Sequence, residues 1–173
     1  MSIEPVPESR IPEFRQMVED YWWEIMRTAD GVRDEASRTD FFNKRFRWDP
    51  DHTPPYWMVK EDRPMAFIQF SIESKKAMIL NFYVDPSARR QGVGSQLVDW
   101  LTGHLDERGI TQIDLTVRRD NPASLAFWES RGYMIGHHQM SMFRDPTTGT
   151  AYKGALSSDF TPEELGFEPW TKR

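Results

Sequence analysis

The sequence predicts an α/β fold in which helices flank a central mixed β-sheet, and three observations indicate it. The 173-residue chain contains segments in which apolar residues recur at helical spacing, together with short strand-like runs. The strand-like run 77–84 is followed by a turn, an amphipathic segment and another strand-like run, which is the order of a parallel βαβ unit. Apolar residues make up 38% and aromatic residues 13% of the chain, which is enough for a packed core.

The first half of the chain predicts two helices and then an antiparallel meander. Apolar residues recur at helical spacing over 11–26, and a second helix is expected over 34–46. A loop with three prolines, 48–55, comes next. Short polar turns then join three strand-like runs, at 56–60, 65–71 and 77–84.

The second half predicts an alternation of helices and strands. An amphipathic helix is expected over 93–105 and a strand over 112–117. Asn121 and Pro122 supply the cap and first residue of a short helix. One or two further strands are expected over 133–143. We expect 1–173 to form a single domain, with 145–173 as a turn-rich C-terminal extension.

Composition excludes several classes of function. The net charge of −5 argues against binding of nucleic acid through its phosphates. The chain has no Cys, and its four His show no metal-ligand spacing, so no metal is expected. No apolar run approaches the ~20 residues of a membrane span, and the first residues do not resemble a signal peptide. We therefore expect a cytoplasmic protein without a membrane or nucleic-acid partner.

The turn after the run 77–84 has the features of an anion site. The first N–H groups of a helix have no partner within it, and the helix dipole makes that end positive. Gly92 and Gly94 would let a phosphate approach the backbone closely, and Arg89 and Arg90 would add positive charge. The alternative is an ordinary tight turn with surface arginines. The sequence matches neither the dinucleotide-binding motif nor the P-loop motif, because Leu97 stands where each of them requires a different residue.

A second motif lies about 30 residues downstream. It consists of Asn121, Ser124, Phe127, Trp128, Gly132 and Tyr133. Together, the two motifs resemble the signature of the GNAT superfamily of acetyl-CoA-dependent N-acetyltransferases, and the resemblance is strong from about 65 to 143. It implies a GNAT-like fold and acetyl-CoA as co-substrate.

The resemblance also implies a set of cofactor-binding residues. In the family, the turn after the strand holds the pyrophosphate of acetyl-CoA; the matching residues are Arg89, Arg90, Gln91, Gly92, Val93, Gly94 and Ser95. The strand end that binds the pantetheine arm matches Phe82, Tyr83 and Val84, and one backbone N–H there would polarise the thioester carbonyl. Asn121, Ser124 and Trp128 match the second motif beside the pantetheine and the thiol. Asn121 could instead be a plain helix cap.

The catalytic residues depart from the family pattern. Trp128 stands where the family commonly has a Tyr that protonates the leaving thiolate, and an indole N–H cannot do so. A base must also accept the proton of the attacking amine. Some relatives have a Glu where this chain has Thr116, so the candidates for the base are Asp114 and Tyr83. Trp128 could instead shape the acyl pocket.

These features predict direct transfer of an acetyl group to a primary amine in a ternary complex, because the chain lacks a Cys nucleophile. The acceptor is a small-molecule amine or a protein amine, and a homodimer stays open. A small or partly apolar amine is favoured over a strongly acidic one by the aromatic residues on the expected acceptor side: Tyr21, Trp22, Trp23, Phe41, Phe42, Trp48 and Trp57. The alternative function is a non-catalytic acetyl-CoA sensor or interaction module.

Overall fold

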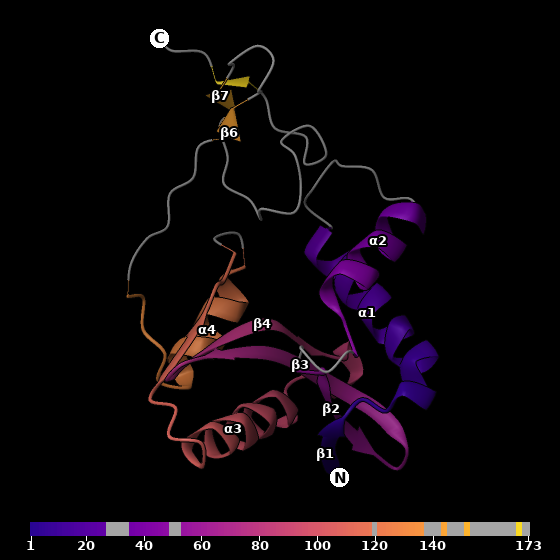
Figure 1. Ribbon diagram of the computed structural model, residues 1–173, viewed down its shortest axis with the longest axis vertical. Coiled ribbons are helices and arrows are strands. Elements are labelled where there is room, and N and C mark those ends of the chain that lie inside the picture. Colours follow the sequence, from indigo (N-terminus) through magenta and orange to yellow (C-terminus); the bar gives the residue numbers. More distant parts are fainter. Residues whose placement is uncertain are drawn as a thin grey trace. The chain divides into compact units, whose positions relative to one another are not determined.

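The computed structural model describes residues 1–26, 35–48, 53–118 and 121–136, and the pairs 143–144, 151–152 and 169–170 (Figure 1). These residues fall into two compact units, Met1–Glu19 with Phe42–Met134, and Asp20–Phe41 with Ile135–Arg173. The helices are α1 (Ile11–Met26), α2 (Glu35–Arg45), α3 (Val93–Asp106) and α4 (Pro122–Ser130), with 3-10 turns η1 (Glu8–Arg10) and η2 (Pro86–Ala88). The strands are β1 (Ser2–Pro5), β2 (Tyr56–Lys60), β3 (Arg63–Glu73), β4 (Lys76–Val84), β5 (Gln112–Leu115), β6 (Phe143–Arg144), β7 (Ala151–Tyr152) and β8 (Pro169–Trp170).

The first unit contains a five-stranded mixed sheet in the order β1-β2-β3-β4-β5. The first four strands are antiparallel neighbours, and β5 runs parallel to β4. The predicted meander and the parallel β4–α3–β5 unit are therefore confirmed. A three-stranded sheet, β6-β7-β8, belongs to the second unit.

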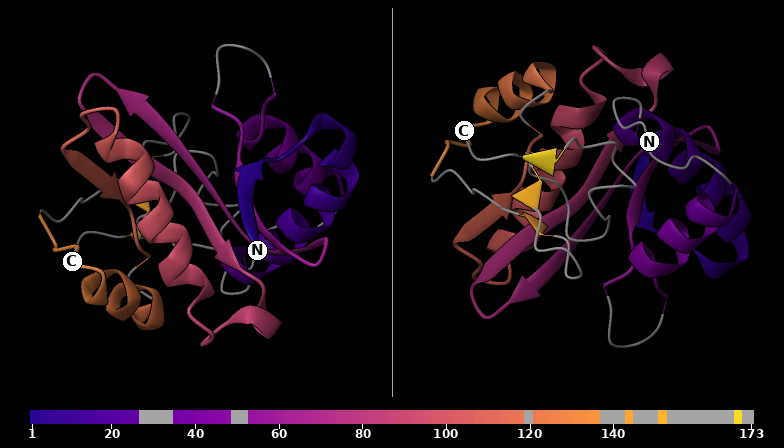
Figure 2. Two further views of the ribbon diagram at one scale, coloured as in Figure 1. Left: turned by 90° about the horizontal axis from the view of Figure 1, so that it is seen from below. Right: turned by 90° about the horizontal axis from the view of Figure 1, so that it is seen from above.

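Both faces of the central sheet are covered, which explains why β3 is buried without interruption from Ala66 to Phe70. On one face, Ile68 and Ile79 pack against Leu97 and Leu101 of α3, which lies across the sheet in Figure 2. On the other face, Phe14 of α1 has its ring 5.1 Å from that of Phe67, centroid to centroid. The apolar stripes expected for both helices are thus core.

A bulge in β4 changes which side chains face which side of the sheet. Gln69 of β3 pairs with Asn81, but the next residue, Phe70, pairs with Ile79, so Leu80 is an extra residue. Ile79 and Phe82 therefore both contribute to the α3 face, although a regular strand would place them on opposite faces. Asn81 and Tyr83 consequently face the opposite side.

The observed elements differ from the expected ones in three places. Strand β1 was not anticipated, because its four residues carry too short a pattern and are defined by pairing with β2. Strand β5 ends at Leu115 rather than at 117, since its pairing with β4 stops at Ile79, directly before the bulge. Of the strands expected over 133–143, residues 133–136 are not in a strand and Phe143 belongs to β6; residues 137–142 lie outside the described part of the chain.

Among the described helices, none combines the length and the apolar character that crossing a membrane requires.

Candidate functional site

The site begins where β4 and β5 separate. Pairing with β5 covers Lys76 to Ile79, and β5 does not extend beside the second half of β4, Leu80–Val84. Backbone groups at such an edge can bond an extended ligand in the way that a neighbouring strand would. The bulge at Leu80 therefore marks the start of an edge suited to a chain of amides, at the strand end that the sequence singled out.

The turn after β4 is held by its own side chains. The N–H of Ser87 donates to Asp85 Oδ1 at 2.8 Å, which caps η2. Gln91 Nε2 donates to the carbonyl of Ser87 at 2.7 Å, and Arg63 Nη2 donates to Ser87 Oγ at 2.9 Å. These bonds define where α3 begins relative to the end of β4.

The two arginines of the turn have different surroundings. Arg89 Nε donates to the carbonyl of Val84 at 2.8 Å, and its guanidinium lies 5.6 Å from the centre of the Tyr83 ring. Arg89 is thus bonded back to β4 and braces the turn. Arg90 is exposed and has a positive φ of 62°. Both residues add positive charge beside the start of α3, as the sequence predicted.

The N-terminus of α3 presents a group of backbone donors. Gly92 is the N-cap with φ 79°, in the left-handed region, and no side chain caps this end. The first intrahelical bond runs from the N–H of Gln96 to the carbonyl of Gly92 at 3.0 Å. The N–H groups of Val93, Gly94 and Ser95 precede it and have no acceptor within the helix. They lie at the positive end of a 14-residue helix, where backbone donors are available to an anion.

Gly94 has a packing role that the sequence did not indicate. A Cβ at this position would lie 3.3 Å from Val84 Cγ2 and 3.4 Å from the ring of Phe127. The missing side chain therefore lets α3 approach β4 and α4 closely. The interpretation of Gly94 as a residue that only opens the backbone to phosphate is incomplete.

The second motif begins α4, with the predicted cap. Asn121 Oδ1 accepts a hydrogen bond from the N–H of Ser124 at 3.0 Å, and Pro122 occupies the first turn. Asn121 is thus a helix cap in this structure, and its side-chain amide remains exposed. The cap and a contact with a cofactor are compatible, because the cap uses only the oxygen.

Trp128 belongs to an aromatic cluster at the end of β4. Its ring centroid lies 5.0 Å from Phe82, 5.1 Å from Phe127 and 5.0 Å from Tyr133. Trp128 is only 5% exposed. It therefore packs beneath the strand end that the pantetheine is expected to follow, and shapes that region sterically.

Tyr133 is a residue to which the sequence analysis gave no chemical role. Its phenol oxygen is buried and has no hydrogen-bond partner among the described residues. Burial raises the pKa of Tyr133, while the nearby Arg131 has the opposite, smaller effect. The phenol thus keeps its proton through the neutral range. The sequence feature that could have indicated Tyr133 is its position directly after Gly132, at the end of the second motif.

The two candidate bases lie on the same side of the sheet. Tyr83 is 5% exposed, with its ring 5.8 Å from that of Phe67. Asp114 is half-buried and pairs with Met78 of β4, so it shares the face opposite α3. Gln112 Nε2 donates to both carboxylate oxygens of Asp114, at 2.9 and 3.0 Å. Asp114 is the more accessible of the two.

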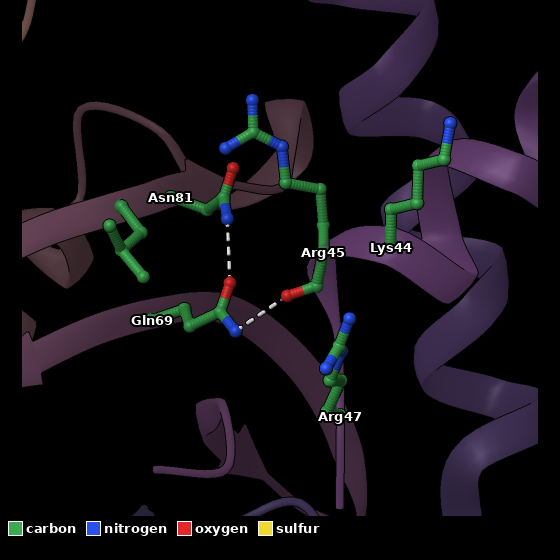
Figure 3. Close-up of a pocket in the computed structure, with 6 residues that line it drawn as sticks. Lys44, Arg45, Arg47, Gln69 and Asn81 are labelled. Atoms are coloured by element: carbon green, nitrogen blue, oxygen red, sulfur yellow. Dashed lines mark hydrogen bonds between the residues drawn. The ribbon is translucent and has the colours of Figure 1, made fainter. Parts of the chain in front are cut away.

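A pocket of about 250 Å³ opens on this same face, next to the bulge (Figure 3). It is lined by side chains from the end of α2, the segment after it, β3 and β4: Lys44, Arg45, Arg47, Gln69, Leu80 and Asn81. Three of these side chains are cationic. Asn81 Nδ2 donates to Gln69 Oε1 at 2.6 Å, and Gln69 Nε2 donates to the carbonyl of Arg45 at 2.8 Å.

Sequence reasoning missed this pocket. It assigned the acceptor side to aromatic residues, four of which are buried core: Trp22, Phe41, Phe42 and Trp57. The available signals were the basic run 44–47 and two amides, Gln69 and Asn81, inside otherwise apolar strands. Within the described ranges, no three acidic or His side chains lie close enough to hold a metal ion.

The geometry agrees with the comparison to known families. The model of the acetyltransferase (GNAT) family matches residues 15–133, which include β4, the turn, α3, β5 and α4. The chain belongs to the GNAT family. The resemblance carried by the two motifs is thereby confirmed, as is the α/β fold with its mixed sheet.

Relatives with curated names match a shorter part of the chain. The [ribosomal protein bS18]-alanine N-acetyltransferase of Salmonella typhimurium strain LT2 is 34% identical over 76 residues, which are 44% of this chain and 51% of the relative. The enzyme of that name from Escherichia coli K12 is 32% identical over 78 residues, 45% and 53% of the two chains. The chain thus spans about half the length of the curated relatives it matches.

Solved GNAT structures match over a larger part of the chain. The PaiA N-acetyltransferase of Thermoplasma acidophilum, solved in complex with coenzyme A, has a TM-score of 0.62 and 17% identity, covering 78% of this chain and 91% of that one. At this identity, the similarity supports the fold alone.

Proposed function

We propose that this GNAT chain is an N-acetyltransferase that moves the acetyl group of acetyl-CoA directly to a primary amine in a ternary complex. One observation carries the proposal. The uncapped N-terminus of α3 and the edge of β4 that β5 leaves uncovered meet at one turn. An anion site and a strand edge for amides are what the diphosphate and the pantetheine arm of coenzyme A require.

The N–H groups of Val93, Gly94 and Ser95 would bind the diphosphate, with Arg89, Arg90 and Gln91 around it. The edge at Phe82, Tyr83 and Val84 would bond the pantetheine amides. A backbone N–H on that edge would stabilise the negative charge that develops on the thioester oxygen. Asn121 and Ser124 would contact the cofactor from α4, and Trp128 would support the strand from below.

In the reaction, the amine nitrogen forms a bond to the acetyl carbon, the carbon–sulfur bond breaks, and coenzyme A leaves as the thiolate. The amine loses one proton. Asp114 is the candidate base that takes it, because its carboxylate is accessible on the face of the sheet opposite α3. Tyr83 is the second candidate. Trp128 does not transfer protons. No cysteine is available for a thioester on the enzyme.

The acceptor would be a small-molecule or protein amine. The relatives named as alanine N-acetyltransferases of ribosomal protein bS18 support a primary amine as acceptor. The homodimer and the cytoplasmic location stay predictions. The chain spans about half of those relatives, so its own acceptor has to be found by experiment.

The coenzyme site can be tested with Ser95→Asp. A carboxylate in the first turn of α3 favours the helix by about 0.3–1 kcal/mol but repels a diphosphate. We expect a folded variant whose Kd for coenzyme A, measured by calorimetry, rises about 10-fold or more, a loss of about 1.4 kcal/mol. Gly92 is less suitable, because any side chain there would be strained at φ 79°.

The matched control for Ser95→Asp is Gly103→Asp, which adds the same charge to α3 at an open position. It should bind coenzyme A like the wild type. Release of thiol from acetyl-CoA should be measured with a panel of amines. Unchanged coenzyme A affinity in folded Ser95→Asp would refute the site, and binding without thiol release from any amine would refute the reaction.

A further inference from the structure

The pocket beside the bulge of β4 concerns the acceptor rather than the coenzyme. We infer that it binds a carboxylate or phosphate group of a small acceptor amine, so that the enzyme acetylates amines that carry an anionic group. This inference rests on the proposed function and names the substrate class of that site.

The pocket is rich in positive charge. Lys44, Arg45 and Arg47 line it, and none of its lining residues is a carboxylate. The chain as a whole carries a net charge of −5, so three cations around one cavity are a local departure from its acidic balance. No described residue forms an ion pair with Arg47, whose planar fork of donors suits a carboxylate or phosphate. A polyamine would meet like charges there.

The pocket is built on a fixed support of buried hydrogen bonds. The carbonyl of Arg45 can only accept, so Gln69 must present its NH₂ group to it and its oxygen to Asn81. Gln69 and Asn81 are each 5% exposed. The hydrogen-bond chain thus ties the end of α2, which carries Lys44 and Arg45 and is followed by Arg47, to β3 and β4 (Figure 3). A preorganised cationic site loses little entropy when an anion binds.

The pocket also lies close to the strand end that is proposed to hold the thioester. Asn81 precedes Phe82–Val84, the strand end proposed to hold the thioester, by one to three residues. At about 3.3 Å per strand residue, the separation along the strand is about 3–10 Å. An amine a few bonds away from its anionic group spans that range. A pocket of about 250 Å³ suits such a compact molecule rather than a folded protein.

An anionic acceptor differs from the partly apolar acceptor that the aromatic residues of the sequence favoured. The aromatic residues concerned are largely core, and the cavity on this face is lined by charged and amide groups.

The test uses pairs of amines that differ only in the anionic group: β-alanine with β-alaninamide, glycine with glycinamide, and phosphoethanolamine with ethanolamine. Spermidine and an alanine-terminated peptide amide complete the panel. For each amine, kcat/KM is measured by thiol release. We expect an anionic member to exceed its neutral partner at least 10-fold, and the carboxylate and phosphate pairs to show which group the site prefers.

The variant is Arg47→Gln, at an exposed position where folding is not at risk, and the matched control is Lys60→Gln, an exposed lysine that does not line the pocket. In Arg47→Gln, the KM for the anionic acceptor should rise about 10-fold while kcat changes less than 3-fold. The preference over the neutral partner should shrink accordingly. In Lys60→Gln, the KM for the anionic acceptor and the preference over the neutral partner should stay as in the wild type.

The outcomes distinguish failure of the anion site from failure of the proposed acetyltransferase activity. Thiol release that favours neutral amines, spermidine or the peptide amide overturns the inference but leaves the acetyltransferase proposal intact. A preference for anionic amines that survives in Arg47→Gln also overturns the inference. If no amine supports thiol release, binding of the same anionic amines is measured by calorimetry. Binding that weakens in Arg47→Gln supports the anion site, and absence of binding refutes it.

Discussion

The side-chain amide of Asn81 on β4 donates to the amide oxygen of Gln69 on β3 at 2.6 Å, directly beside the bulge residue Leu80. Both side chains are almost fully buried, each 5% exposed. The pair therefore satisfies two polar groups that would be costly alone, and it lies where β4 turns from a paired strand into an open edge.

Breaking this pair should destabilise the protein. Asn81→Leu leaves Gln69 Oε1 buried without its donor, and we expect a loss of about 1–3 kcal/mol in the free energy of unfolding. Urea denaturation measures it. Gln69→Leu should cost at least as much, because it also removes the donor to the carbonyl of Arg45. The double variant should cost less than the sum of the two single variants; strict additivity would show that the amides are not coupled.

Gly94 and Gly103 of α3 should respond in opposite ways to alanine. At Gly94, the new Cβ would press on Val84 and Phe127, and we expect a loss of about 1–3 kcal/mol. At Gly103, nothing lies within 4 Å of a Cβ, so Ala should stabilise the helix by about 0.5–1 kcal/mol. Thermal and urea denaturation compare the two. A neutral Gly94→Ala would mean that α3 can move away from β4 without cost.

Asn121 allows capping and cofactor contact to be separated. Asn121→Ala should lose about 1 kcal/mol of stability with the cap. Asn121→Ser keeps a capping oxygen but lacks the amide NH₂ group, so its stability should stay close to that of the wild type. If the amide contacts the cofactor, the affinity of Asn121→Ser for coenzyme A falls several-fold. Wild-type affinity in this variant would leave Asn121 with the cap alone.

Tyr133 should make stability depend on alkaline pH. Its pKa is raised by burial above the ordinary value of 10.0, so the folded phenol keeps its proton at a pH where the unfolded one has lost it. Unfolding then releases a proton, and the free energy of unfolding falls as pH rises above about 10. Tyr133→Phe should remove part of this fall and cost little at pH 7, because no described hydrogen bond is lost. Parallel pH curves for both proteins would contradict the assignment.

The two candidate bases can be ranked by substitution. Asp114→Asn keeps an oxygen for Gln112 and removes the charge, and we expect about a 100-fold decrease in kcat/KM with the anionic acceptor. Tyr83→Phe should decrease it less, because Tyr83 is buried against Phe67. Unfolding midpoints check that both variants are folded. A larger effect of Tyr83→Phe would reverse the ranking.

Much of the fold and half of the site could be predicted because their signals are local. The helix over 11–26, the cap formed by Asn121 and Pro122, and the glycine before α3 depend on a few neighbouring residues each. β1 could not be predicted in this way, because a four-residue strand is defined by its partner β2 rather than by its own pattern.

The sequence by itself determined the family, the βαβ unit and the helix end that is proposed to bind a diphosphate, because capping, left-handed glycine and apolar period act within one or two turns of chain. Only the tertiary structure decided that Trp128 is core, that Gly94 is a packing residue, and that Arg45, Gln69 and Asn81 meet at one cationic pocket. The pocket depends on the register of β3 against β4, where one extra residue, Leu80, changes which side chains face the side of the sheet opposite α3.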